Sequence, residues 1–178
     1  MRKGMLFISA TILITASLLG PAFAKDCRRN TVFIHTHKGL ITDTVPPPDV
    51  MDIVAAAIYS LNTFSIEKVA ALYTPNAVIA DDEPPYSWNG PTAGVQWVNA
   101  VEQVCKDNRL TKLKGTIEAI NVFQQTTDNV YIVVPVNYSG ELPGKTHFTS
   151  RGAFTFVLRM INGRWMIKSQ AWMPKKGM

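Results

Sequence analysis

Cysteine is scarce in this sequence, and its two cysteines lie far apart. Among 178 residues only Cys27 and Cys105 are cysteines, and no Cys-x-x-Cys pair is present. The chain therefore lacks the motif of thioredoxin-like redox proteins. It also lacks a phosphate-binding loop, a dinucleotide fingerprint, a nucleophile elbow and a zinc-protease motif. We therefore expect no cofactor.

Candidate metal ligands are also few. Of three histidines, His35 and His37 lie two residues apart, where a strand places them on one face. A protein metal site usually has three or four protein ligands, and no third ligand is evident for this pair. The sequence therefore predicts no metal site. His147 lies beside a turn, where we expect a surface imidazole, with an acid or base role as the alternative.

Charge of one sign is not in large excess. The 18 Lys and Arg residues face 13 Asp and Glu residues, a net charge of +5. Without Arg2 and Lys3, which belong to the leader described next, 16 basic residues remain against 13, a net charge of +3. The remaining basic residues are scattered or terminal and form no stripe. The sequence therefore does not indicate a nucleic-acid-binding protein.

The one long apolar run lies at the N-terminus. Residues 1–24 begin with Arg2 and Lys3, continue with an apolar stretch and finish with Ala22-Phe-Ala24. This order predicts a secretory signal peptide that is cleaved after Ala24. A membrane anchor is the alternative, but the stretch is short for a bilayer core of about 30 Å. We expect an exported protein, periplasmic or secreted, with no membrane association after cleavage.

Export affects whether the two cysteines are expected to form a disulfide. An oxidising compartment favours a disulfide between Cys27 and Cys105. Sequence spacing does not show that their Cα atoms come within the roughly 4.4–6.8 Å that a bridge requires. Two independent thiols are therefore the alternative.

The rest of the chain has the length of one domain. Residues 25–48 have an irregular pattern that ends in three prolines, and they predict an N-terminal extension. The domain itself is placed at residues 49–178.

Three helices are predicted in the first half of this domain. Apolar residues recur at helical spacing over residues 50–62, and Asp49 is placed to cap the helix. A second, shorter helix is predicted at residues 67–73 and a third at residues 92–105. A short strand at residues 77–80 leads into an acidic, proline-rich loop.

The second half of the domain is rich in β-forming residues. Asn162-Gly163 lies between two β-rich runs and predicts a hairpin with a tight turn. Helices followed by an antiparallel meander indicate an α+β fold. The four β-rich runs are residues 114–124, 129–139, 148–161 and 164–172.

Three segments carry a family resemblance. In residues 66–81, IEKVAALYTPNAVIAD, a helix ends, a turn follows and a strand delivers an acid. Gly90-Pro-Thr-Ala-Gly94 is similar to the start of a third helix, and residues 154–167, FTFVLRMINGRWMI, to a terminal hairpin. Together they resemble the nuclear transport factor 2-like superfamily and its SnoaL-like proteins. The resemblance covers residues 50–172. It implies a cone-shaped α+β fold, with about three N-terminal helices packed on a curved antiparallel sheet around an apolar pocket.

The resemblance places Asp81 where ketosteroid isomerase and its relatives have a general-base aspartate. Desolvation at an apolar pocket raises a carboxyl pKa, which suits proton abstraction beside a carbonyl. The alternative is a solvated acidic loop formed by Asp81, Asp82 and Glu83. Steroid isomerases also need a Tyr and a protonated Asp as oxyanion donors. Those positions fall on Ala57 and near Phe154, so steroid isomerase activity is not expected.

Aromatic side chains are the predicted lining of the pocket, with ordinary core packing as the alternative. The candidates are Tyr59, Trp88, Trp97, Tyr138 and Phe154. Trp165 and Trp172 belong to the same aromatic set, but the sequence does not favour the pocket over the core for them. Arg151 is expected either to bind a ligand carboxylate or to form a cross-strand ion pair.

Three functions are consistent with these features. The first is an exported protein that binds a small apolar or amphipathic molecule without strong catalysis, because a complete catalytic set is missing. The second is a cofactor-free isomerase, cyclase or lyase with Asp81 as general base. The third is a homodimeric interaction module, because residues 129–139 carry apolar side chains on both strand faces.

Overall fold

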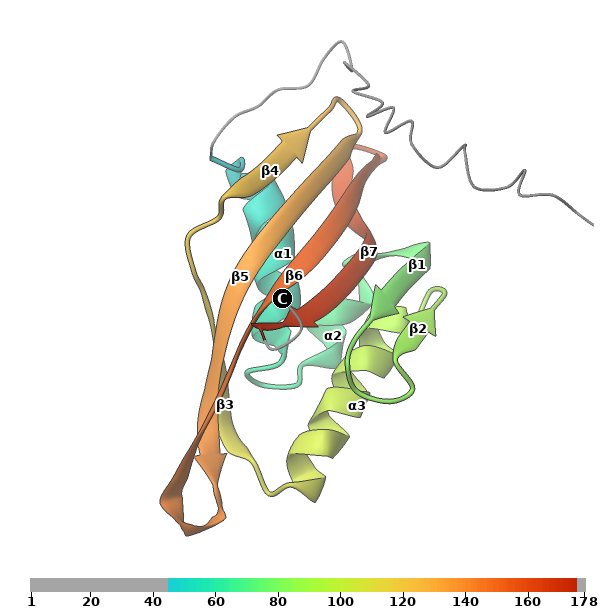
Figure 1. Cartoon of the computed structure of the whole chain (residues 1–178). Coiled ribbons are helices and arrows are strands. Elements are labelled where there is room, and N and C mark those ends of the chain that lie inside the picture. The colour runs from blue at the N-terminus through green and yellow to red at the C-terminus, as the bar shows by residue number, and fades with distance from the viewer. Residues whose placement is uncertain (1–44, 176–178) are drawn as a thin grey trace, which may run out of the picture. The chain divides into compact units, whose positions relative to one another are not determined.

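The helices of the domain lie on one side of a curved sheet (Figure 1). The computed structural model describes residues 45–175. Within these residues there are three α-helices: α1 (Pro48–Ser60), α2 (Ile66–Ala70) and α3 (Ala93–Asp107). The three helices predicted from the sequence are therefore confirmed, although their ends differ by a few residues.

The start of α1 differs from the predicted cap. The helix begins at Pro48, and proline suits the first helical position because its φ is preset and no N–H is needed there. Asp49 consequently lies inside the first turn. Its Oδ2 accepts a hydrogen bond of 3.0 Å from the indole Nε1 of Trp165. Its Oδ1 accepts a hydrogen bond of 3.0 Å from the backbone N–H of Val50. The carboxylate therefore links α1 to the last strand and also pairs with a first-turn N–H, although the N-cap position itself is Pro47.

Seven strands within the described residues form one mixed sheet, in the order β2-β1-β7-β6-β5-β3 with β4 paired to β5. Their bounds are β1 (Tyr73–Ala80), β2 (Ser87–Asn89), β3 (Thr111–Ile117), β4 (Val122–Gln125), β5 (Asn129–Leu142), β6 (Thr146–Ile161) and β7 (Arg164–Pro174). Every pair is antiparallel except β1 with β7, which is parallel. The α+β class is confirmed, and the predicted antiparallel sheet is corrected to a mixed one. Such a parallel pair is sterically feasible because a long connection, including α3 and five strands, separates β1 from β7.

Two predicted boundaries are wrong. Tyr73 was expected in a helix at residues 67–73, but it begins β1, and its hydroxyl donates a hydrogen bond of 2.6 Å to Oε1 of Gln170. Tyr73 is 4% exposed, so tertiary packing outweighs the local helical spacing. The run predicted at residues 114–124 is divided into β3 and β4, which both pair with β5.

The predicted hairpin between β6 and β7 is confirmed. Asn162 has a φ of 49° and Gly163 a φ of 76°. Both values lie in the left-handed region that a type I′ hairpin turn requires at its two central residues. The turn therefore joins two strands that were both predicted.

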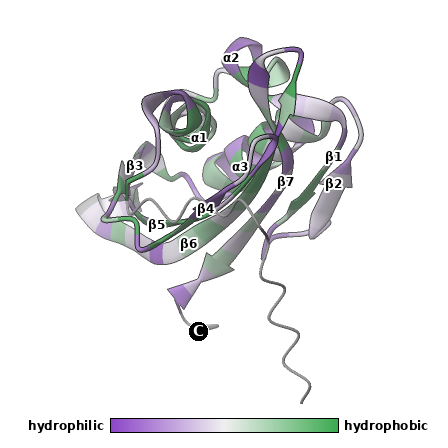
Figure 2. Cartoon of the chain, turned by 90° about the horizontal axis from the view of Figure 1, so that it is seen from above, coloured by the Kyte–Doolittle hydropathy of each residue, from purple (hydrophilic) through white to green (hydrophobic). Residues whose placement is uncertain are grey.

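The core lies between the helices and the sheet (Figure 2). Along β5, Val130, Ile132, Val134 and Val136 are each at most 1% exposed, whereas Tyr131 is 40% exposed. This alternation is the period of a strand with one buried face. One face of β5 therefore packs towards the helices and the other faces outwards.

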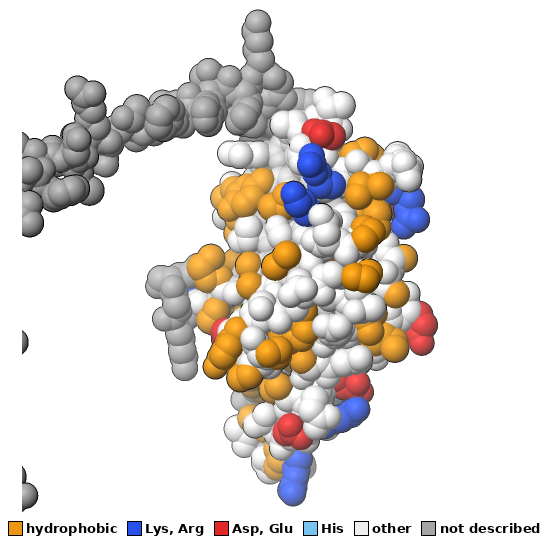
Figure 3. Space-filling view, turned by 90° about the vertical axis from the view of Figure 1, so that its right-hand side faces the viewer, with side chains coloured by type: hydrophobic (Ala, Val, Ile, Leu, Met, Phe, Trp, Pro, Cys, Tyr) orange, Lys and Arg blue, Asp and Glu red, His pale blue; other side chains and the backbone are white. Residues whose placement is uncertain are grey.

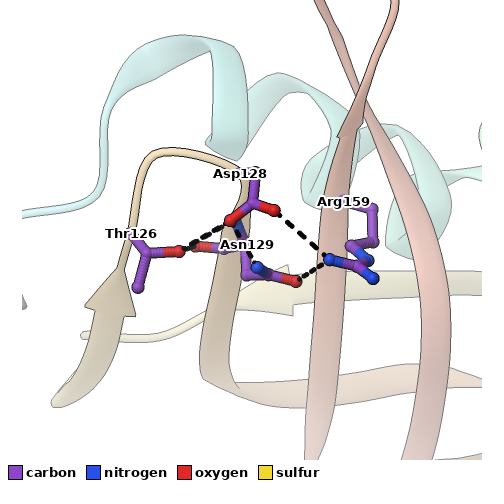
Figure 4. Close-up of polar contacts among 4 residues, drawn as sticks. All are labelled: Thr126, Asp128, Asn129 and Arg159. Carbon is purple, nitrogen blue, oxygen red and sulfur yellow. Dashed lines mark hydrogen bonds and ion pairs between the residues drawn. The ribbon is translucent and has the colours of Figure 1, made fainter. Parts of the chain in front are cut away.

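A polar cluster closes the turn between β4 and β5 (Figure 4). Thr126 Oγ1 accepts a hydrogen bond of 3.1 Å from the backbone N–H of Asn129. From β6, Arg159 donates to Asn129 Oδ1 at 3.0 Å and lies 3.4 Å from Asp128 Oδ2. Exposed ion pairs of this kind contribute about 0–1 kcal/mol. The cluster therefore fixes a turn, and none of its residues lines the cavity described below.

Apolar side chains also remain on the surface. Figure 3 shows the side on which β1 and β2 lie, with hydrophobic side chains spread between small groups of charges. On the outer face of the sheet, Val122 and Tyr131 are each 40% exposed, and Met173 is 43% exposed. Single exposed apolar residues are common on monomers. The homodimer therefore stays a prediction.

Several predictions fall outside the described residues. These are the signal peptide at residues 1–24, most of the extension at residues 25–48, and the histidine pair His35 and His37. Within residues 45–175, no helix has both the length and the apolar character to cross a membrane.

Candidate functional site

A cavity of about 410 Å³ lies between α3 and the sheet. Its walls come from α3, from the loop after β1, and from β3, β5, β6 and β7. Most of the lining side chains are apolar, and cavities of roughly 300–1,000 Å³ with such linings are typical small-molecule sites. We therefore take this cavity as the candidate functional site.

One face of α3 forms a wall of the cavity. The lining residues are Trp97, Val101, Val104 and Cys105, and Asn108 directly after the end of the helix. Their spacing of four, three, one and three residues is that of one side of an α-helix. The wall therefore follows directly from the helical pattern in the sequence.

Alternate residues of two neighbouring strands form the opposite wall. Tyr138 and Leu142 project from β5, and Phe148, Ser150 and Phe154 project from β6. Successive side chains point to opposite faces of a strand, so residues two apart share a face. Tyr138 pairs directly with Ser150, which places a phenol and a hydroxymethyl group side by side in the wall.

An aromatic cluster forms one part of the cavity. The ring centroid of Phe154 lies 4.7 Å from that of Trp172, 5.8 Å from that of Trp97 and 6.4 Å from that of Tyr138. Tyr138 and Trp172 are 5.7 Å apart. Aromatic pairs at such distances contribute about 0.5–1.5 kcal/mol beyond their buried area. The cluster therefore holds the rings that face the cavity in place.

Two glycines leave room for these rings. A Cβ atom at Gly115 of β3 would lie 2.8 Å from Cε1 of Tyr138. A Cβ atom at Gly152 of β6 would meet the backbone oxygen of Met173 and would lie 2.6 Å from Cη2 of Trp172. Because these distances are shorter than van der Waals contact, another residue at Gly115 would displace the Tyr138 ring, and one at Gly152 would displace both the Trp172 ring and the backbone of β7.

Asp81 places a carboxyl group in this largely apolar cavity. Its Oδ2 accepts a hydrogen bond of 2.7 Å from Nε1 of Trp97. Burial raises the pKa of Asp81 to about 6, while the Trp97 indole N–H lowers it and the neighbouring Asp82 raises it. The carboxylate is therefore mostly ionised at pH 7, yet it takes up a proton far more readily than an exposed aspartate.

Asp81 also differs from the rest of the acidic loop. Asp82 and Glu83 line the cavity but are exposed to solvent. Asp81 is only partly exposed, and its Oδ1 accepts a long hydrogen bond of 3.4 Å from the backbone N–H of Glu83. The loop therefore contains one partly desolvated acid and two solvated ones.

Tyr138 contributes a second polar group. It is 6% exposed, and its hydroxyl has no hydrogen-bond partner among the described residues. Burial, and then the negative charge of Asp81, raise the pKa of the Tyr138 phenol, which therefore stays protonated at neutral pH. Buried hydroxyls are normally hydrogen-bonded. Tyr138 thus adds a buried hydroxyl without a partner among the described residues to the wall of the cavity.

The structure brings together four of the seven predicted site residues: Asp81, Trp97, Tyr138 and Phe154 all line this cavity.

The other three lie elsewhere. Tyr59 projects from α1 and is 43% exposed. Trp88 is buried in the core on β2. Arg151 has the opposite strand parity to Ser150 and Phe154, so it lies on the outer face, where its Nη2 is 2.7 Å from Oε1 of Glu118. The predicted lining is therefore corrected at these three positions, and Arg151 forms the alternative ion pair.

Cys105 lines the cavity, whereas His147 does not. Cys105 is 5% exposed, and Cys27 lies outside the described residues, so the disulfide between them stays a prediction. His147 is exposed on β6, as expected. Among residues 45–175, no group of three or more His, Cys, Asp or Glu side chains is placed to hold a metal ion.

Replacement of Trp97 by Phe is expected to raise the pKa of Asp81 above about 6. The reason is that the indole N–H stabilises the carboxylate form. A ¹³C NMR titration of the Asp81 carboxyl group measures the change. Trp165→Phe is the matched control, because the Trp165 indole donates to Asp49 instead. An unchanged Asp81 titration in Trp97→Phe would show that the indole does not stabilise the carboxylate.

A sequence model described as "SnoaL-like domain" matches residues 48–170. No curated protein matches the chain by sequence.

Solved structures resemble the domain at low sequence identity. A hexachlorocyclohexane dehydrochlorinase, LinA-type3, from Novosphingobium barchaimii is 14% identical with a TM-score of 0.59, covering 73% of this chain and 90% of its own. A proposed scytalone dehydratase from Novosphingobium aromaticivorans is 12% identical with a TM-score of 0.58, covering 71% and 82%. A nuclear transport factor 2-like superfamily protein from Salmonella enterica is 12% identical with a TM-score of 0.58, covering 70% and 87%. These likenesses show the fold.

Proposed function

The chain belongs to the SnoaL-like domain family, and on that premise we propose that it binds a small, mainly apolar molecule in the cavity beside Asp81. The family has a nuclear transport factor 2-like fold and includes both ligand-binding proteins and cofactor-free isomerases and dehydratases. Fold alone does not choose among these activities. The proposal therefore depends on the residues of the cavity.

The observation that carries the proposal is a polar pair in an apolar cavity. Asp81 and Ser150 lie in a lining otherwise formed largely by aliphatic and aromatic side chains. Small-molecule sites typically have this composition, in which apolar side chains supply affinity and a few polar groups fix orientation. The ligand is therefore a molecule with an apolar body and at least one polar group.

Filling the cavity tests this proposal. Ser150→Trp is expected to abolish binding of naphthalene, a purely apolar probe, because Ser150 lines the cavity. Binding is measured by ¹H–¹⁵N NMR, from shifts of the Trp97 and Trp172 indole N–H signals. Native mass spectrometry of protein purified from its own compartment checks for a co-purified ligand.

Ser139→Trp is the matched control for this experiment. Ser139 is adjacent to Tyr138 on β5 but is exposed on the outer face, so the same large side chain should leave naphthalene binding intact. Failure of the wild-type protein to bind naphthalene, or equal binding by both variants, would contradict the proposal.

A second candidate function is proton transfer by Asp81. The specific observation is the position of its carboxyl group in the cavity, where its pKa is raised to about 6. General bases work best with a pKa near the working pH. The reaction class is a cofactor-free isomerisation, cyclisation or elimination, in which the carboxylate removes a proton from a carbon beside a carbonyl group and the bond electrons move to the carbonyl oxygen.

Export remains part of the proposal. The basic, apolar and Ala-x-Ala order of residues 1–24 supports it. N-terminal sequencing of the protein from a periplasmic or culture fraction tests it, with Lys25 expected as the first residue.

A further inference from the structure

We propose that the cavity selects organic cations, so that its ligand carries a positively charged amine on an apolar body and that amine lies beside Asp81. This inference rests on the proposed ligand-binding function and names the polar group of the ligand. Neutral and anionic molecules of the same shape are expected to bind more weakly.

All the charged side chains that line the cavity are acidic. They are Asp81, Asp82 and Glu83, and no Lys, Arg or His of the described residues belongs to the lining. Two other titratable groups in the lining, Cys105 and Tyr138, stay uncharged at neutral pH because burial raises the pKa of each. The chain as a whole has more basic than acidic residues. The acidic lining is therefore a local feature and does not follow from overall composition.

The basic residues near α3 in the sequence do not neutralise this lining. The Nζ atom of Lys106 lies 2.8 Å from Oε1 of Glu102, and that of Lys112 lies 2.9 Å from Oε1 of Glu141. Arg109 lies between two lining residues in the sequence, but it is exposed and is not part of the lining. Among the described residues, no cation in the wall balances the negative charge of the cavity.

Asp81 in particular has no cationic partner among the described residues. Its carboxylate accepts hydrogen bonds from neutral N–H groups, the Trp97 indole at 2.7 Å and the Glu83 backbone at 3.4 Å. The ion pairs found within residues 45–175 do not include it. A partly buried carboxylate is destabilised unless an opposite charge lies close to it, and burial accordingly raises the pKa of Asp81 to about 6. A ligand cation supplies the missing opposite charge.

The carboxylate also has room for a ligand donor. Two carboxylate oxygens offer about four lone-pair sites, and the N–H groups of Trp97 and Glu83 occupy two of them. Asp81 belongs to the lining and is not fully buried, so it is accessible to a molecule in the cavity. Hydrogen bonds from an ammonium group to a carboxylate are stronger than neutral ones. An amine cation therefore gains more here than a neutral donor of the same size.

Aromatic rings add to the attraction for a cation. Trp97, Phe154 and Trp172 line the cavity, and the ring of Phe154 contacts both indoles. The face of an aromatic ring attracts a cation that lies within about 6 Å of the ring centroid, and indole does so most strongly. The apolar body of the ligand packs against the same group of rings. A neutral molecule of the same shape has the packing without the attraction of charge.

Three probes with the same naphthalene body separate charge from shape. At pH 7, 2-naphthylmethylamine is positively charged, 2-naphthalenemethanol is neutral and 2-naphthoate is negatively charged. Dissociation constants come from NMR titration of the Trp97 and Trp172 indole signals. We expect the amine to bind at least about tenfold more tightly than the alcohol, and the naphthoate to bind more weakly than the alcohol because the acidic lining repels it.

Asp81→Asn removes the charge and keeps the size of the side chain. It is expected to weaken binding of the amine about tenfold and to change binding of the alcohol much less. Asp52→Asn is the matched control, because Asp52 is exposed on α1 and does not line the cavity. A merely structural role of Asp81 would change the binding of all three probes by the same factor.

Salt separates Asp81 from the two exposed acids. Asp82 and Glu83 are solvent-exposed, and salt screens exposed charges strongly, whereas partly buried pairs are screened much less. The preference for the amine over the alcohol is therefore expected to persist at about 0.5 M NaCl, where the Debye length is only a few ångströms. Loss of the preference at this salt concentration would show that general surface charge, and not Asp81, attracts the amine.

The outcomes distinguish this inference from the function on which it rests. If naphthalene binds but the amine binds no more tightly than the alcohol, cation selection is refuted while the apolar binding site stands. The same conclusion follows if Asp81→Asn keeps the full preference for the amine. If neither naphthalene nor any of the three probes binds the wild-type protein, both proposals are refuted.

Discussion

Asp81→Asn is expected to reduce proton transfer in the cavity by a factor on the order of 10² to 10⁴, the usual contribution of a positioned general base. Asn keeps the size of the side chain, and its amide oxygen still accepts the Trp97 hydrogen bond, but it cannot take up a proton. Deuterium exchange at the carbon beside the carbonyl of small ketones, followed by ¹H NMR in D₂O, measures this reaction without knowledge of the natural substrate. The wild-type rate is expected to rise with pH and to level off above the Asp81 pKa of about 6.

The same variant is expected to be more stable than the wild type at neutral pH. In the unfolded chain an aspartate has a pKa near 3.9, whereas in the folded protein burial raises the pKa of Asp81 to about 6. Below about pH 4 the group is protonated in both states. As the pH rises to about 6, the unfolded state loses its proton first, so the unfolding free energy falls and then stays constant.

The stability gained by Asp81→Asn should therefore be absent near pH 4 and complete above about pH 6. Allowing for partial solvent access, its size is on the order of 2 kcal/mol. Urea unfolding at several pH values measures it. Asp52→Asn, at an exposed position on α1, is the control for loss of one negative charge.

Two outcomes would contradict this account of Asp81. Equal exchange rates in wild type and Asp81→Asn would exclude the carboxylate as the base, and would leave ligand binding as the function. A stability difference between the two proteins that does not change with pH would show that the carboxyl group is not desolvated in the folded state.

The part of the site carried by local periodicity could be predicted from the sequence. Asp81 was predicted from the family resemblance, which itself rests on a local feature, a strand followed by an acid, and Trp97 was predicted as an aromatic residue within a helical run. Tyr138 and Phe154 were predicted as aromatic residues within β-rich runs. The hydrogen bond between Trp97 and Asp81 could not be predicted, because it depends on how α3 lies against the end of β1.

Trp172 shows why the rest of the site could not be predicted. If the pairing of β6 with β7 stayed regular from the Asn162-Gly163 turn onward, Trp172 would pair with Ala153. Its side chain would then lie on the outer side of the sheet. The register shifts by one residue between Val157 and Leu158, and Trp172 instead pairs with Phe154. A one-residue shift moves every later side chain to the other face. The sequence contains no clear signal for this bulge, so its effect on the cavity was not predictable.

Arg151 and Tyr59 illustrate the same limit. Each was predicted for its chemistry, but its orientation depends on strand or helix register. Arg151 is adjacent to Ser150, which lines the cavity, yet it points to the other face and pairs with Glu118. Residue type thus indicated which groups were available, whereas register decided which of them met in the cavity.

Phe154→Ala is expected to lower the unfolding free energy by about 3–5 kcal/mol, the usual cost of truncating a buried aromatic residue to alanine. Phe154 is 1% exposed, and its ring contacts those of Trp97, Trp172 and Phe156. Because single domains are stable by only about 5–15 kcal/mol, the loss is large. Urea unfolding should show a lower midpoint with an unchanged slope.

The location of Phe154 gives this prediction a functional consequence. The ring is both core and cavity wall, so its removal should also loosen Trp97, the residue that donates to Asp81. Phe154→Leu retains most of the side-chain volume and is expected to cost less than half as much. Phe148→Ala is a second comparison, because Phe148 lines the cavity but is only partly buried. If Phe154→Ala lowers the unfolding free energy by no more than Phe148→Ala does, that result would show that the aromatic cluster does not hold the helices and the sheet together. The fixed positions of Trp97 and Tyr138 would then have another cause.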